Sequence, residues 1–203
     1  MRCPYCKHPV QAATPECGRC GLSFDKVGRL FGALPHVKNG LNDRSMLLSR
    51  KRRKKIESQL REIEVRFPQV HVTILLTPEL AEDTQLGSYA FWIFNSPGVC
   101  RGLEKGAMNH AILLTVDSSN RRANMIVGYG LEPYFEEAKL HEILACGREE
   151  FAEDNLGDGI EAVLNGVHVQ LHRLVQTLDA VEPGNVDMLA ARPKRVRTEA
   201  TSY

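Results

Sequence analysis

The stretch "AILLTVDSSNRRANMIVGYG" at residues 111–130 contains two short apolar runs separated by a polar segment. The runs at 111–117 and 122–130 are rich in β-branched and other apolar residues, which is typical of strands buried in a sheet. The polar residues at 118–121 predict a turn that joins these two strands. A further run, "VHVTILL" at 70–76, is bounded by prolines and predicts another buried strand.

Segments with apolar residues at helical spacing lie on both sides of these strands. From about 46 to 67, residues Ile56, Leu60 and Ile63 recur with the period of a helix that Ser45 would cap. Three more helices are expected, at 78–95, 133–151 and 156–178. The order α-β-α-β-β-α-α predicts an α/β fold, a layered α/β sandwich in which helices flank a small mixed sheet.

The composition is that of a folded chain of moderate size. At 203 residues and 43% apolar content, it fits one medium domain with an appendage. The net charge of +1 argues against a protein devoted wholly to nucleic acid. No run approaches the roughly 18 apolar residues that span a bilayer, and no signal peptide is recognisable, so we expect a cytoplasmic protein without a membrane span.

Four of the six cysteines lie in the first twenty residues, as the pairs Cys3/Cys6 and Cys17/Cys20. Two C-x2-C pairs supply the four tetrahedral thiolate ligands that Zn²⁺ prefers, and Gly21 follows the second pair where a tight turn needs positive φ. Disulfides would require an export route, and a redox pair would require a βαβ unit. Iron in a rubredoxin-like site uses the same ligands and stays an alternative to zinc.

A closed four-cysteine site leaves no position for a metal-bound water, so the expected role of this zinc is structural. The chain then divides into a small N-terminal zinc ribbon at 1–23 and a Gly- and Asn-rich linker at 24–45. The α/β domain occupies 46–178, and a basic tail without periodicity, expected to be disordered, occupies 179–203.

Several motifs of the α/β domain resemble those of the TPM domain family, which is named for a thylakoid acid phosphatase, a photosystem II repair protein and a receptor modulator. The clearest is "VGYGLE" at 127–132, which ends a strand and is followed by an acidic residue at Glu137. The similar segments are "SYAFWIFN" (88–95), "MNHAILLTV" (108–116) and "EDNLGDGIEAVLNGV" (153–167). Two departures stand out: His110 replaces the usual glycine, and the export signal and membrane anchor common in the family are not recognisable.

Loops at the strand ends carry a set of oxygen ligands. Because ligands of open α/β sheets bind beyond strand ends, we expect the following residues to lie near one edge: Asn109, Asp117, Glu132, Glu137 and Asp158. Such oxygens suit Ca²⁺ or Mg²⁺, and the resemblance implies metal-assisted phosphate ester hydrolysis. The alternative is that these acids serve helix starts and turns without any metal.

Two basic clusters, "RKRRKK" at 50–55 and "RPKRVR" at 192–197, are suited to phosphate backbones or anionic lipid. Neither is interleaved with aromatic residues, so nucleic acid is the less favoured partner. The sequence favours a cytoplasmic binding or adaptor module that meets a protein partner through its ribbon. The alternative function is a divalent-metal-assisted phosphatase.

Overall fold

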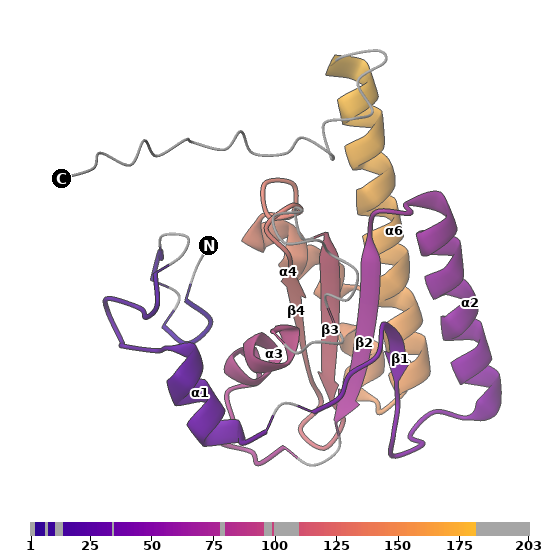
Figure 1. Cartoon of the computed structure of the whole chain (residues 1–203). Helices are drawn as coiled ribbons and strands as arrows, with labels where there is room; N and C mark the ends of the chain where they lie inside the picture. Colours follow the sequence, from indigo (N-terminus) through magenta and orange to yellow (C-terminus); the bar gives the residue numbers. More distant parts are fainter. Residues whose placement is uncertain are drawn as a thin grey trace.

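The computed structural model describes residues 3–6, 8–10, 14–33, 35–77, 80–95, 99 and 110–181. Within these residues, a four-stranded sheet carries helices on both faces (Figure 1). The strands are β1 (Gly40–Asn42), β2 (His71–Thr77), β3 (Ala111–Asp117) and β4 (Arg122–Val127). The helices are α1 (Phe24–Phe31), α2 (Arg50–Arg66), α3 (Leu86–Phe94), α4 (Glu137–Ala145), α5 (Arg148–Ala152) and α6 (Leu156–Val181).

The sheet is mixed, with the strands in the order β1-β2-β3-β4. β1, β2 and β3 are parallel, whereas β4 forms an antiparallel hairpin with β3. Every residue of β3 is buried, which is why its sequence is an almost unbroken apolar run. The expected α/β fold with a small mixed sheet between helices is confirmed. No helix in the described part of the chain is long and apolar enough to cross a membrane.

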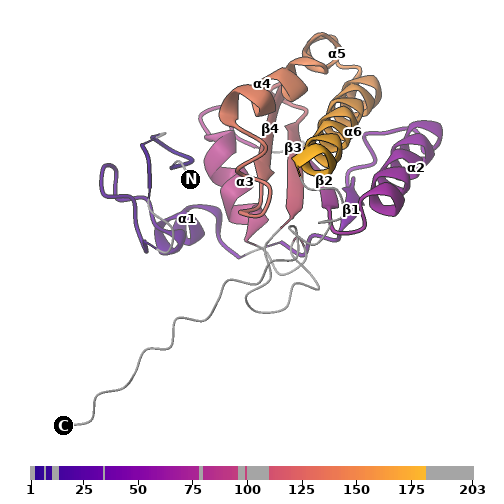
Figure 2. The same ribbon diagram turned by 90° about the horizontal axis from the view of Figure 1, so that it is seen from above.

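Alternate residues of β2 and β3 contribute to two separate cores. Ile74 and Leu114 belong to the larger core, which α2, α4 and α6 cover. Leu75 and Leu113 belong to the smaller core, together with Trp92 of α3 and residues of α1. Figure 2 shows these two groups of helices on opposite sides of the sheet.

The segment 24–45, which we expected to be a linker, contains a helix and an edge strand. α1 begins after Ser23, whose hydroxyl accepts a hydrogen bond from the backbone N–H of Lys26 at 3.3 Å. β1 pairs with β2 over three residues only. Elements this short show little periodicity, because their order depends on packing against α3 and β2 and not on their own sequence.

Two helices begin later than the sequence predicts and are therefore shorter. α2 begins after Ser49, not Ser45, since the Ser49 hydroxyl accepts a hydrogen bond from the backbone N–H of Arg52. Of the helix expected at 78–95, the structure has α3 from Leu86 onward. The residues before it that the structure describes form turns.

The single helix expected at 133–151 is divided into α4 and α5 around Gly147. This glycine packs so closely on α6 that a Cβ there would lie 2.6 Å from the carbonyl oxygen of Gly159. Close contact with α6 therefore determines where the helix is interrupted. No proline marks this interruption in the sequence. α6 itself continues to Val181, and the rest of the expected tail lies outside the described residues, as does most of the loop at 96–110.

We predict that Gly147→Ala lowers the free energy of unfolding by about 1–3 kcal/mol, because the added methyl meets backbone and cannot be accommodated by a side-chain rotation. Gly18→Ala is the matched control, since no atom lies within 4 Å of a Cβ at that position. It should change stability by no more than about 0.5 kcal/mol. Urea unfolding measures both, and equal stability of the two variants would contradict the packing described here.

Candidate functional site

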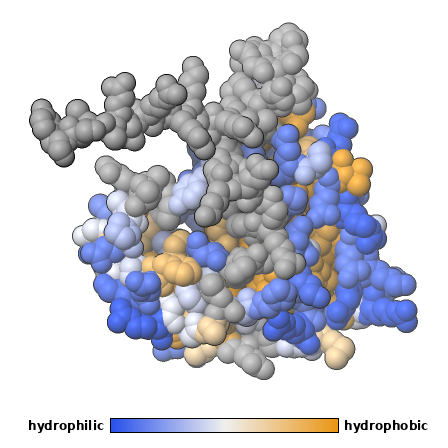
Figure 3. All heavy atoms as spheres, in the orientation of Figure 1, coloured by the Kyte–Doolittle hydropathy of each residue, from blue (hydrophilic) through white to orange (hydrophobic). Residues whose placement is uncertain are grey.

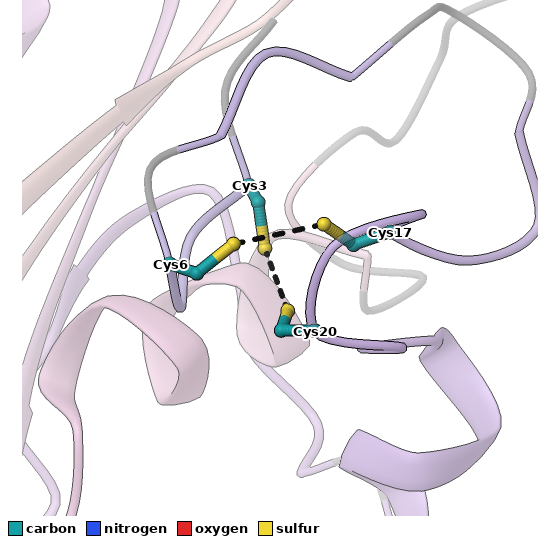
Figure 4. Close-up of side chains that lie close together, drawn as sticks. All are labelled: Cys3, Cys6, Cys17 and Cys20. Atoms are coloured by element: carbon teal, nitrogen blue, oxygen red, sulfur yellow. Dashed lines mark hydrogen bonds between the residues drawn. The ribbon is translucent and has the colours of Figure 1, made fainter.

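The four N-terminal cysteines converge on one point. Their sulfur atoms all lie within 4.8 Å of one another, and the four side chains point inward (Figure 4). The Sγ atoms of Cys3 and Cys20 are 3.6 Å apart, and those of Cys6 and Cys17 are 3.7 Å apart. A tetrahedral zinc with Zn–S bonds of about 2.3 Å requires sulfur–sulfur distances of about 3.8 Å. The cysteines are therefore spaced as a four-thiolate metal site requires and could hold a metal such as zinc.

The second cysteine pair lies on a tight hydrogen-bonded turn. The N–H of Gly21 donates to the carbonyl of Cys17 at 2.7 Å, and the N–H of Cys17 donates to the carbonyl of Leu22 at 2.8 Å. Gly21 has φ of 65°, the left-handed conformation that its place after the pair predicted. The backbone of this turn thus holds Cys17 and Cys20 in position without help from a large core.

The thiols influence one another's ionisation. The backbone N–H groups of Cys20 and Arg19 lower the pKa of Cys17 to about 6. At Cys20, the backbone N–H of Leu22 lowers the pKa, but desolvation and the neighbouring thiols of the other three cysteines raise it to about 12. One thiolate therefore forms readily while further negative charge is opposed, and a bound cation would relieve this opposition.

Helix α1 connects this cluster to the α/β domain. The Lys26 ammonium donates to the carbonyl of Gly21, which ties the helix to the cysteine turn. The ring of Phe24 packs in a tilted arrangement against Trp92 of α3, with ring centroids 4.7 Å apart. Gly28 packs against the same indole, since a Cβ there would lie 3.0 Å from it. The ribbon is therefore attached to α3 through α1 and does not hang from a free linker.

Two of the five proposed oxygen ligands lie on the side where β3 ends, and both are in ion pairs. Asp117 is completely buried and accepts hydrogen bonds from Arg122 at 2.6 Å and Asn120 at 2.9 Å. Asp158, in the first turn of α6, pairs with Arg52 of α2 at 2.6 Å. Each carboxylate thus has a structural partner.

Glu132 and Glu137 lie beyond the opposite end of the hairpin. They follow β4, whose last residue, Val127, pairs with Ile112 near the start of β3. The expectation that all candidates share one edge is therefore wrong, because β4 runs antiparallel to β3. Asn109 lies outside the described residues. Among the residues that are described, only the four cysteines bring three or more potential metal ligands close together.

A pocket that sequence reasoning missed opens between the starts of α2 and α6 and the β3–β4 turn. Its volume is about 560 Å³, within the range of small-molecule sites. Its polar lining includes Ser49, Arg52, Ser118, Asn155 and Asp158. The sequence feature that could have indicated this pocket is charge. The basic helix start at 50–55 and the acidic helix start at 153–158 attract each other.

His110, which stands where the resembling family has glycine, precedes β3 and is buried. Its Nε2 has no hydrogen-bond partner among the described residues. Burial and the nearby His71 both lower its pKa, which favours the neutral imidazole. Tyr129, in the turn after β4, has a raised pKa because of burial and the charge of Glu132.

We predict that Cys17→Ser abolishes tight binding of about one zinc ion per chain, because a tetrahedral site loses one ligand. The emission of Trp92, the only tryptophan, should shift to the red because α1 then loses its anchor. Cys146→Ser is the control, since this exposed cysteine lies outside the cluster. Metal analysis measures the zinc content of each variant, and fluorescence measures the emission maximum of Trp92. Full zinc content in Cys17→Ser would contradict the assignment of the metal site, and zinc loss without a shift in Trp92 emission would contradict the anchoring of α1 by the cysteine turn.

A second prediction concerns the ion pair between the buried Asp117 and the partly exposed Arg122. Arg122→Ala should lower the free energy of unfolding by about 3 kcal/mol, because a buried carboxylate loses its counter-ion. The exposed pair of Lys139 and Glu142 is the control, and Lys139→Ala should cost less than about 0.5 kcal/mol. Chemical denaturation measures both variants. A mild effect of Arg122→Ala would mean that Asp117 is not held mainly by this partner.

Comparison with known proteins agrees with the fold. Residues 41–170 match the TPM domain. The N-terminal domain of a protein from P. gingivalis is 23% identical with a TM-score of 0.53, over 70% of this chain and 82% of that chain. Two further structures are the N-terminal domain of cg2496 from Corynebacterium glutamicum (9% identity, 67% and 82% coverage, TM-score 0.46) and BA42 from Bizionia argentinensis (14%, 63% and 86%, 0.48). No curated protein matches the chain. With well over half of its residues matched, the chain belongs to the TPM domain family.

Proposed function

We propose that this TPM domain protein acts in the cytoplasm as a binding or adaptor module whose ribbon holds a structural zinc ion. The observation that carries the proposal is the cluster of four sulfurs at tetrahedral spacing. Four thiolates complete the coordination of zinc and leave no place for substrate or water. The metal would then stabilise a surface and perform no reaction.

The N-terminal segment offers apolar side chains to a protein partner. Tyr5 in the first cysteine turn and Leu30 on α1 are 52% and 75% exposed. Phe24, at the start of α1, is 39% exposed although it contacts Trp92. Aromatic and large aliphatic side chains of this kind provide the central contacts of protein interfaces. Since α1 packs on α3, a partner bound here would be held rigidly relative to the whole domain.

A phosphatase that uses Ca²⁺ or Mg²⁺ is the second candidate, and the pocket between α2 and α6 favours it. That pocket is large enough for a phosphate ester and has Asp158 in its wall. Against it, Asp158 pairs with Arg52, Asp117 pairs with Arg122, and Glu132 lies at the other edge. A metal would have to displace these cations before it could bind, so the binding role is the better supported one.

The adaptor role predicts that Leu30→Glu removes a specific protein partner recovered by cross-linking in cells. Val169→Glu is the matched control, because Val169 is a half-exposed residue of α6 on the other side of the sheet. It should leave the partner bound. Both variants should keep the zinc content and the melting temperature of the parent chain, so that loss of binding is not loss of folding.

Two results would overturn the adaptor proposal. One is equal recovery of the same partners by Leu30→Glu and Val169→Glu. The other is steady turnover of a phosphate monoester that requires Ca²⁺ or Mg²⁺ and is lost in Asp158→Asn with the fold intact. An amide NMR titration with Ca²⁺ locates any such cation site directly, through shifts confined to the residues near it.

A further inference from the structure

The first turns of α2 carry six consecutive basic residues, and three of them are paired with acids. Arg52 contacts Asp158 and Glu161, and Lys55 contacts Glu161. Arg53 pairs with the buried carboxylate of Asp43 at 3.0 Å. These contacts fix the start of α2 against α6 and the preceding loop, so the helix start is a rigid part of the domain.

The other three basic residues are exposed: Arg50, Lys51 and Lys54. No acid among the described residues forms an ion pair with them. Lys54 follows Lys51 by three positions and Arg50 by four, so the three side chains share one face of the helix. Positive charge in a first helical turn also opposes the helix dipole, and α2 has no acidic residue there to compensate. These three residues therefore form no ion pair that stabilises the fold, which suggests that they bind a partner outside the chain.

The loop just before α2 places apolar side chains beside this charge. Met46 is 78% exposed and Leu47 is 37% exposed. Met46 has φ of 52°, a conformation that is costly for a residue with a side chain. The Asp43 carboxylate maintains it by accepting hydrogen bonds from the backbone N–H groups of Leu47 at 2.9 Å and Leu48 at 3.1 Å. The loop is therefore held in a shape that leaves Met46 in solvent.

Charge is concentrated here although the whole chain is almost neutral. The first turns of α2 carry six basic residues, opposed by the three acids in the ion pairs, which leaves three positive charges at this end of the helix. The exposed Asp154 lies in the wall of the neighbouring pocket and reduces this field on that side. The outward face of α2 is predominantly hydrophilic, as seen at the right of Figure 3.

We propose that the β1–α2 loop and the start of α2 form a docking surface for anionic lipid bilayers. Arg50, Lys51 and Lys54 would contact acidic headgroups, and Met46 would enter the interface between headgroups and acyl chains. Basic residues that surround exposed apolar side chains are the pattern of peripheral membrane attachment. A surface for single-stranded nucleic acid would add aromatic side chains on which bases stack, and the described part of this surface contains no aromatic residue.

This surface is independent of the proposed adaptor function. The ribbon and α1 lie on the α3 side of the sheet, whereas α2 lies on the opposite side (Figure 2). Failure of either proposal would therefore leave the other intact. Together, the two surfaces would let one rigid domain hold a protein partner near a membrane.

The test is sedimentation of the full chain with vesicles of phosphatidylcholine containing about one-third phosphatidylserine, and with vesicles of phosphatidylcholine alone. Each basic residue near an anionic surface changes the partition constant about fivefold, so Lys51→Glu/Lys54→Glu should reduce binding at least tenfold. Met46→Ser should weaken binding severalfold without removing its dependence on salt. Arg61→Glu is a charge-reversal control on the same helix, since this exposed residue of α2 lies beyond the basic start, and it should bind like the parent chain.

The contribution of the basic tail is tested separately with the variant Arg195→Ala/Arg197→Ala. When Lys51→Glu/Lys54→Glu is added to this variant, it should still reduce vesicle binding. Equal binding to both kinds of vesicle would overturn the proposal, as would equal loss in Arg61→Glu and Lys51→Glu/Lys54→Glu. It would also be overturned if no vesicles bind while a labelled oligonucleotide binds through the same lysines. In every variant, an unchanged melting temperature shows that the fold is retained.

Discussion

The burial of β3 on both faces is the constraint on which the rest of this structure depends. A strand without a single exposed residue needs apolar cover above and below the sheet. On one side, α2, α4 and α6 supply it, with α6 the longest helix. On the other side, α3 is only nine residues long, and α1 extends the cover through Val27 and Phe31. The N-terminal cysteines therefore belong to the architecture of the sheet, because they anchor the helix that completes it.

Much of the fold could be predicted from the sequence because its strands are long, apolar and bounded by turns. The strand at 111–117 has the predicted bounds, and the cysteine spacing led directly to the observed cluster. α1 and β1 could not be predicted, since their order comes from distant partners. The prediction that the five oxygen ligands lie at one edge of the sheet was wrong for a simpler reason. The turn at 118–121 reverses the chain, so Glu132 lies at the opposite end of the hairpin from Asp117.

Charged residues in this protein act mainly as connectors between elements far apart in sequence. Arg122 joins β4 to Asp117 and also donates to the carbonyls of Glu82 and Thr84, so one side chain holds the segment before α3. Arg52 similarly joins the starts of α2 and α6. A sequence shows that such residues are charged but not which of them are neutralised. The distinction matters, because only the unneutralised ones are available to a ligand.

Because the cover on the α3 side of the sheet is small, the cysteine cluster matters beyond its own turn. α1 has eight residues, fewer than an isolated helix needs to be stable in water, and its polar contacts at the N-terminal end come from the cysteine turn. Its remaining support is the contact of Phe24, Val27 and Phe31 with the second core. The same short helix thus contacts both the cysteine turn and Trp92. Any change that orders the cysteines should favour the packed state of α1, and any partner that binds the packed α1 should in turn favour the ordered cysteine cluster, since linked equilibria act in both directions.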